Sequence, residues 1–343
     1  MRSTIKIVIL LFFICTSMSG ASFPDMEKYM RQHALIWEQL PMQWNEGAFL
    51  GNGLVGMMVY ADSTLNALVF HLGRPDVTDH RKAPYRKTSI GTEEADKMVD
   101  FCRLDVGKML LFPEGKILSG TFYLDIYNAE LTGHLKTDKG DLTFHAYTPQ
   151  PEEVNIVEVS SGVPYRWKGI PGNPCSPRIR VFPHLKEKLK YKDNPAPVVN
   201  QKDKEGSWVQ SLLAGGDYAT YWKEVPGGKS RSVLYVSTAN EVPASSLSLA
   251  KAMKTVEATQ ITGTKLLKQK TRQWWNAYHE RSFHSGQKTG ELLFHTDVQT
   301  CHLFSSGWPG NGRNGHFLQT EPMAQFLVEP KYTTDLYAHR TSQ

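Results

Sequence analysis

The chain is poor in cysteine and has no recognisable pattern of metal ligands. Its 343 residues include four cysteines. Cys102 and Cys175 could pair in an oxidising compartment or remain free thiols, and their wide separation leaves both alternatives open. The isolated histidines His71, His134 and His145 are expected to be core or surface residues rather than ligands. We therefore predict no metal site and no cofactor.

Long apolar runs are also absent after the first residues. Arg2 and Lys6 precede an apolar run from Ile7 to Cys15, and residues 19–21 offer small side chains for cleavage after Ala21. The run is too short to span a bilayer, so it predicts an export signal over residues 1–21 and no transmembrane segment. We expect a periplasmic or extracellular protein; a lipid anchor on Cys15 is the alternative, although Phe-Phe-Ile before it is unusual for one.

An excess of charge of one sign is missing as well. The formal net charge is +5, and a group of lysines between Lys186 and Lys192 lies in a loop-like stretch with few aromatic residues. Such a run is typical of a solvated surface. The sequence predicts no binding to nucleic acid.

Regular patterning is absent from residues 284–343. Neither alternation nor a helical stripe is sustained there. Codons can be chosen so that a frame shifted by one nucleotide encodes an amphipathic, aromatic-rich segment, and Met323-Ala324 must then give Trp with any codons. We interpret these residues as an out-of-frame, disordered tail; a genuine flexible terminus is the alternative.

The middle of the chain, in contrast, is rich in short apolar strands. Turn residues separate them, for example Asp138-Lys139-Gly140 between Leu135 and Leu142. The expected strands are residues 54–60, 65–72, 121–127, 142–147, 155–159, 208–213, 218–225 and 232–238. Many strands with few helices predict a mainly β fold, a large antiparallel β-sandwich over residues 22–244.

Helical spacing replaces the strand pattern from Ser245 onward. Leu249, Met253 and Val256 recur at helical intervals, and Ser245 and Ser246 are candidate N-caps. A second helix is expected from about residue 264 to 278, with Trp274 and Trp275. Residues 245–283 are either an appendage on the sandwich or a linker into a helical domain.

Three segments carry a family resemblance, and a fourth departs from it. IWEQLP at residues 36–41 and WNEGAFLGNGLVGMMVY at residues 44–60 resemble the opening of glycoside hydrolase family 95, the α-L-fucosidase/galactosidase-related family. RQWWNAYHERS at residues 272–282 looks like the linker helix that enters that family's (α/α)6 barrel. LGRPD at residues 72–76 departs from the family's Asn-Glu strand end, which indicates a neighbouring branch.

The resemblance implies a sandwich-plus-barrel enzyme whose catalytic barrel is missing here. In the shifted frame, two asparagines that would position water and sugar straddle Glu329/Pro330 and Lys331/Tyr332, and neither exists as translated. Inverting glycoside hydrolysis needs a general acid and a base. Since the family places both in the barrel, no catalytic residue is predicted in this chain; the pairs Glu152/Glu153 and Asp76/Asp79 are expected to be strand-end and turn carboxylates.

The resemblance also suggests where sugar would contact the sandwich. The candidate substrate-binding residues are Trp44, Asn45, Glu46, Asn52, Arg74 and Asp76. The other interpretation of the Gly51-Asn52-Gly53 turn is conformational, because Gly and Asn tolerate positive φ in tight connections.

Three functions follow. The first is the N-terminal part of an exported glycoside hydrolase that acts on oligosaccharides or polysaccharides and is inactive as translated. The others are a non-catalytic carbohydrate-binding or surface β-sandwich and an unrelated secreted structural sandwich. An exposed linker also predicts self-association.

Overall fold

The computed structural model describes residues 25–79, 103–188, 190–228, 230–241 and 247–285. The predicted export signal, Cys102, the candidate N-caps Ser245 and Ser246, and residues 286–343 lie outside these ranges.

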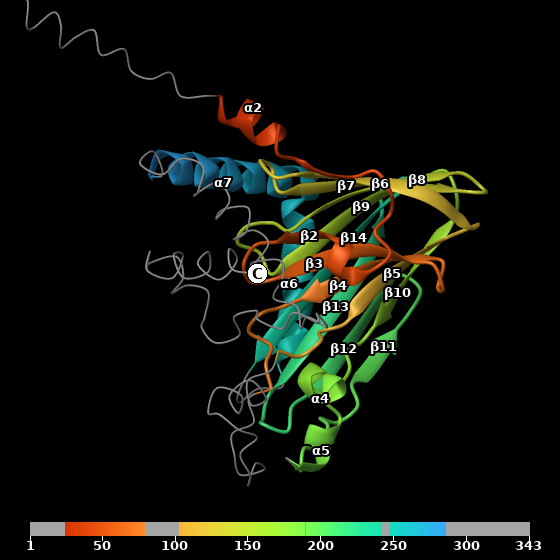
Figure 1. The fold of residues 1–343 in the computed structure, drawn as a ribbon, viewed down its shortest axis with the longest axis vertical. Helices are drawn as coiled ribbons and strands as arrows, with labels where there is room; N and C mark the ends of the chain where they lie inside the picture. The colour runs from red at the N-terminus through yellow and green to blue at the C-terminus, as the bar shows by residue number, and fades with distance from the viewer. Residues whose placement is uncertain (1–24, 80–102, 189, 229, 242–246, 286–343) are drawn as a thin grey trace, which may run out of the picture.

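Two antiparallel sheets form the body of the molecule (Figure 1). In spatial order, the large sheet contains β1 (Leu35–Trp37), β6 (Ile117–Asp125), β7 (Glu130–Thr137), β8 (Asp141–Tyr147), β9 (Val154–Ser161), β14 (Arg231–Glu241), β13 (Asp217–Pro226), β12 (Glu205–Ser211) and β11 (Val198–Gln201). The small sheet contains β10 (Tyr165–Ile170), β5 (Lys108–Pro113), β4 (Ala67–Gly73), β3 (Gly56–Asp62) and β2 (Ala48–Gly51). The predicted mainly β, antiparallel sandwich is therefore confirmed.

Helices and one 3-10 turn complete the described structure. They are α2 (Met26–Arg31), η1 (Trp44–Glu46), α4 (Pro177–Val181), α5 (His184–Lys188), α6 (Ser248–Thr262) and α7 (Thr264–Ser285). None of the helices in the described ranges is long and apolar enough to cross a membrane.

The main core lies between the two sheets. Along β6, Phe122 and Leu124 are buried while Thr121 and Tyr123 are exposed, because successive side chains of a strand point to opposite faces. Phe144 of β8 packs edge-on against both Phe122 and Phe70 of the small sheet, at ring centroid distances of 5.5 and 5.3 Å. These contacts join the two sheets through one apolar layer.

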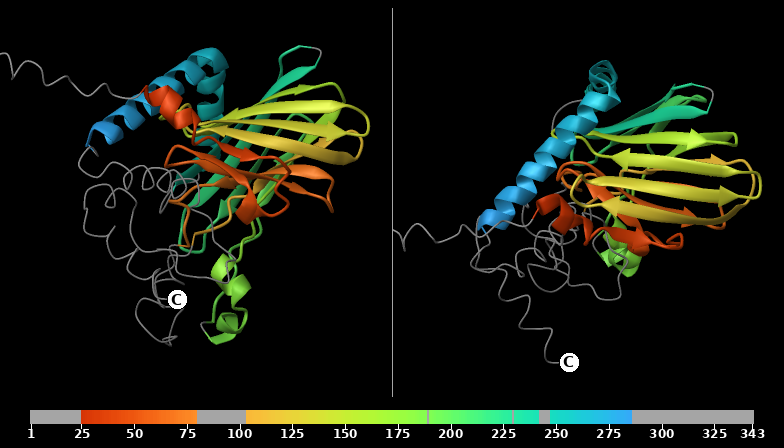
Figure 2. Two further views of the ribbon diagram at one scale, coloured as in Figure 1. Left: turned by 45° about the horizontal axis from the view of Figure 1, so that its top comes forward. Right: turned by 90° about the horizontal axis from the view of Figure 1, so that it is seen from above.

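A second, smaller core lies on the other face of the large sheet. Val154 and Ile156 of β9 and Tyr235 of β14 pack there with Val256 of α6 and Leu267 of α7. Because the helices cover this face, β9 and β14 are buried on both sides and lose the alternation that β6 shows. Figure 1 shows α6 beside β13 and β14, and Figure 2 shows α7 crossing one end of the strands.

The helices differ in detail from the sequence prediction. Helix α6 buries Ser248, Ala252, Val256 and Thr259, whereas Met253 of the predicted stripe is 37% exposed. Small side chains at positions 248 and 252 let α6 lie close to the sheet, so Val256 of the predicted stripe is buried while Leu249 and Met253 are not. Helix α7 begins as predicted at Thr264 but continues past the expected end at residue 278 and reaches residue 285.

Candidate functional site

Three of the six candidate residues meet at one end of the sandwich, which we call the α7 end. It contains the turn between β2 and β3, the end of β4, the connection between β8 and β9, and the end of β14. Asn52 and Arg74 both bond to the β8–β9 connection, at Glu152 and Glu153 respectively, and Asp76 binds Arg74. The structure therefore brings Asn52, Arg74 and Asp76 together.

The side chain of Asn52 is used fully inside the protein. Its Nδ2 donates to the carbonyls of Pro149 and Glu152 at 2.8 and 2.9 Å. Its Oδ1 accepts from the backbone N–H groups of Leu54 and Val55 at 3.1 and 3.0 Å. An amide side chain has two donors and two acceptor positions, so these bonds occupy all four. Asn52 thus closes the β2–β3 turn and ties it to the β8–β9 connection.

Arg74 is the buried charge of the α7 end. Its side chain is 3% exposed and forms a bidentate pair with Asp76 at 2.7 and 3.0 Å. It also donates to Glu153 and to the carbonyl of Thr238 in β14. Burial disfavours its charge, but the carboxylates outweigh this effect and raise the pKa of Arg74. Lys251 of α6 lies 3.8 Å from Glu153 and extends the network to the helices.

The other three candidates lie elsewhere. Trp44, Asn45 and Glu46 form η1, which precedes β2, whereas Asn52 follows that strand. Since a strand rises about 3.3 Å per residue, the two groups sit at opposite ends of β2. Asn45 and Glu46 are exposed, and the Glu46 carbonyl accepts the indole N–H of Trp37 at 2.8 Å. The six residues therefore do not form one surface.

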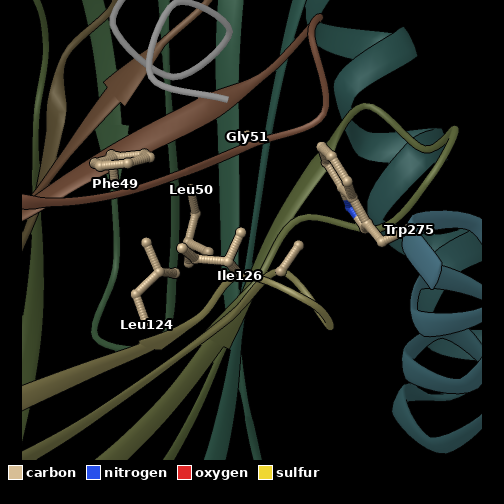
Figure 3. A pocket seen from close by; sticks show the side chains of 7 residues that line it. Phe49, Leu50, Gly51, Leu124, Ile126 and Trp275 are labelled. Atoms are coloured by element: carbon tan, nitrogen blue, oxygen red, sulfur yellow. The ribbon is translucent and has the colours of Figure 1, made fainter. Parts of the chain in front are cut away.

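Trp275 also lies at the α7 end and covers a small cavity there (Figure 3). The cavity is lined by Phe49, Leu50, Gly51, Leu124, Ile126, Ala129 and Trp275. Its volume of about 30 Å³ suits a water-sized molecule, whereas ligand pockets measure roughly 300–1,000 Å³. The cavity is too small for a sugar ring, so the role of Trp275 is to cover the apolar edge between the sheets.

The two adjacent tryptophans of α7 differ in environment. Trp275 is 5% exposed, and its partner is the sandwich itself rather than a further domain. Trp274 is 40% exposed and stacks on Tyr278 with an interplanar angle of 6°. Self-association through this exposed aromatic face stays a prediction.

A group of charges joins α7 to the outer face of the large sheet. We call Glu130, His145, Glu158, Lys268 and Arg272 the α7 ion network. His145 lies between the carboxylates, with Nε2 2.8 Å from Glu130 and Nδ1 3.5 Å from Glu158. Arg272 binds Glu130 with two nitrogens, and Lys268 lies 2.9 Å from Glu158. Each carboxylate therefore contacts a helix cation and the histidine.

The network shifts the pKa values of its members. Burial alone would raise the pKa of Glu130, but Arg272 and His145 outweigh it and lower that pKa to about 2. The pKa of Glu158 is lowered to about 2 in the same way, against burial, by His145 and Lys268. Burial lowers and the two carboxylates raise the pKa of His145, with a net increase.

Further titratable groups have structural partners. Asp105 accepts the backbone N–H of Gly107 at 3.0 Å and lies 3.2 Å from Nε2 of His71. Burial opposes this arrangement, but His71 lowers the pKa of Asp105 to about 2. Asp79 is buried and accepts the hydroxyl of Tyr191 at 2.7 Å. His134 lies on the surface, 3.7 Å from Asp141.

Metal-binding groups and shifted pKa values bear on the chemistry of the described residues. No cluster of three or more His, Cys, Asp or Glu side chains in the described ranges could hold a metal ion. Every described carboxyl with a resolved pKa shift has a lowered pKa, whereas a general acid needs a raised one. Cys175 is a free thiol, and burial raises its pKa to about 11.

Comparison with known proteins identifies no family. No protein-family model matches the chain, and no curated protein matches it. A solved structure described as "Putative kojibiose phosphorylase from human microbiome" superposes with a TM-score of 0.41 at 8% identity. The match covers 66% of this chain and 32% of that chain, so the chain spans about a third of that protein's length. A similarity of this extent identifies neither a family nor an activity.

Proposed function

We propose that this chain is the N-terminal part of an exported glycoside hydrolase of the inverting exo-glycosidase class, and that it is inactive as translated. The observation that carries the proposal is the order of its parts. A two-sheet sandwich continues into two helices that pack on it, and the second helix bears the adjacent tryptophans Trp274 and Trp275. This order is the one that the resemblance of residues 36–60 and 272–282 implies.

The carboxyls with resolved pKa shifts agree with inactivity. An inverting enzyme holds its acid and base about 6.5–9.5 Å apart on opposite sides of the sugar, and the acid must be protonated near neutral pH. Glu130, Glu158 and Asp105 have lowered pKa values and are therefore ionised at that pH. Glu153 is occupied by Arg74.

Two experiments test the proposal. Purified chain incubated with aryl α-fucosides and aryl galactosides should release no more aglycone than buffer, and a frame-restored chain provides the matched comparison. Turnover that a point substitution within residues 22–283 abolishes would overturn the proposal.

Sequencing the gene beyond the codon for Gln343 gives the second test. Several hundred further codons in the shifted frame that encode helical patterns support a longer enzyme, and non-coding DNA contradicts it.

The burial of Trp275 favours a second candidate, a carbohydrate-binding or surface sandwich without catalysis. Because Trp275 finds its partner inside the chain, α7 does not need a barrel to cover it. The exposed residues of η1 would then offer the sugar-contacting face. This candidate predicts that the chain is retarded in gels that contain polysaccharide. The retardation should be lost on Trp44→Ala and retained on Trp274→Ala.

A further inference from the structure

The two halves of α7 are attached to the sandwich by different chemistry. In the first half, Lys268 and Arg272 contact the carboxylates of Glu158 and Glu130. These contacts lie on the outer face of the large sheet, where Leu267 joins the second core. Ionic contacts to β7 and β9, together with the packing of Leu267, thus hold the first half.

The second half is held by neutral contacts at the turn between β6 and β7. Nδ2 of Asn276 donates to the carbonyl of Tyr127 at 2.9 Å. Nε2 of His279 lies 3.1 Å from the carbonyl of Ile126, so this nitrogen carries the proton and donates it. Trp275 fills the space beside them, against the cavity between the sheets.

His279 occupies a site built for the uncharged ring. It is 4% exposed and lies between the rings of Trp275 and Tyr127, with centroid distances of 5.8 and 6.2 Å. Protonation would add a charge and a second N–H to this buried ring. Burial outweighs the Ile126 carbonyl and the charge of Asp125, and it lowers the pKa of His279 to about 4.

Charged and titratable groups face His145 and His279 from the neighbouring elements. His145 faces Glu130 of β7, Glu158 of β9 and Lys268 of α7. Its own strand adds the ring of Tyr147. His279 faces Asp125 at the end of β6. Helix α2, which also packs against α7, carries Glu27, Lys28 and Arg31, and Glu27 and Arg31 form their own pair at 2.6 Å.

We propose that α7 is a pH-responsive element, whose second half leaves the end of the sandwich when the solution becomes acidic while its first half remains docked. The release would uncover Trp275 and the apolar walls of the cavity. The proposal does not depend on the function proposed above.

The pH range of the release follows from the direction in which docking shifts the pKa of each histidine. His145 has a raised pKa when docked, so its stabilisation is fully present below about 6.5, the value of a free histidine, and is lost as the pH rises through the docked pKa. His279 has a docked pKa of about 4. Because a released His279 protonates near pH 6.5, release is favoured increasingly as the pH falls from about 6.5 to 4. Glu130 and Glu158 stay ionised throughout this window.

Hydrogen exchange of the full chain, read in peptides of α7, tests the proposal. After correction for intrinsic rates, opening of residues 273–285 should increase on the order of tenfold between pH 7.5 and pH 5. Residues 264–272 should not open more at pH 5. The proposal is overturned if residues 273–285 show no increase, or if both halves open together.

Two variants separate the roles of the histidines. His279→Gln keeps a donor for the Ile126 carbonyl but cannot become charged, so it should remove the acid response. His145→Gln should keep that response and reduce the protection of residues 264–272 at pH 5. A full response in His279→Gln overturns the proposal. If His279→Gln is already open at pH 7.5, the deciding measurement is the pH at which opening of residues 273–285 is half complete in the unmodified chain. A midpoint between pH 4 and 6.5 supports the proposal, and a midpoint outside this range contradicts it.

Discussion

At the residue scale, the polar groups of the α7 end serve mainly as internal contacts. A polar residue at a strand end can either bind a ligand or close a turn, and the sequence alone does not distinguish the two. The structure shows that Asn52 satisfies two backbone N–H groups and two carbonyls, and that Arg74 joins β4 to β14. Asn52 thus uses all four of its hydrogen-bonding positions, and Arg74 uses at least four of its five N–H donors.

Replacing Asn52 by Ala should therefore destabilise the sandwich. The change leaves the N–H groups of Leu54 and Val55 and the carbonyls of Pro149 and Glu152 without that partner, and we expect a loss of about 2–4 kcal/mol in the free energy of unfolding. Urea unfolding monitored by circular dichroism measures it. Asn45→Ala is the matched control, because Asn45 is exposed, and it should change stability by less than about 0.5 kcal/mol. Equal effects of the two substitutions would contradict the structural role of Asn52.

At the element scale, the sequence predicted strands better than it predicted helix faces. The Asp138-Lys139-Gly140 turn joins β7 and β8 as expected, and Gly140 has φ 151°, which explains why glycine stands there. Helix α7 buries a stripe at every fourth residue, Leu267, Thr271, Trp275 and His279. Because two of these are polar, an apolar-periodicity criterion finds half the stripe and misses the interface.

The adjacent tryptophans of α7 provide the sharpest test of this interface. Trp275→Ala removes a large buried ring and should destabilise the docked helix by about 3–5 kcal/mol. Trp274→Ala removes a half-exposed ring stacked on Tyr278, so a loss of less than about 1.5 kcal/mol is expected. Guanidinium unfolding of both variants compares the two losses. A larger loss for Trp274→Ala would contradict an orientation of α7 that buries Trp275 against the sandwich.

Acid stability tests the ion network that holds the first half of the same helix. Glu130 has a pKa lowered to about 2 when folded, so its contribution is present above about pH 4.5 and is lost as the pH falls toward 2. Glu130→Gln should reduce stability at pH 6 and flatten its decrease between pH 4.5 and 2.5. The midpoint of urea unfolding, measured across this range, reports both effects. Asp141→Asn, near the exposed His134, should leave the decrease unchanged.

At the scale of the whole molecule, the sequence specified the fold class but not the arrangement of strands. Local patterns identify a strand and its hairpin neighbour, because these contacts are close in sequence. They do not show that β1 pairs with β6, that β10 pairs with β5, or that β9 pairs with β14. The predicted strand ranges also omit β1, β2, β5, β10 and β11. In β11 all four residues are exposed, so this edge strand carries no burial pattern. The candidate residues were separated for a different reason: Trp44 and Asn52 are close in sequence, but the extended strand β2 lies between them and places them at its opposite ends.

Helix α7 should be the last element that the folded unit needs. The buried residues of both cores lie between Ala48 and Leu267. A chain ending at residue 285 should therefore keep the cooperative unfolding transition and the Tm of the full chain, as measured by calorimetry. A chain ending at residue 263 loses Leu267, Trp275 and the cations of the α7 ion network, and its Tm should fall by about 10 °C. If removing residues 286–343 lowered Tm as much as removing α7 does, those residues would belong to the folded unit, and the interpretation of an out-of-frame tail would be wrong.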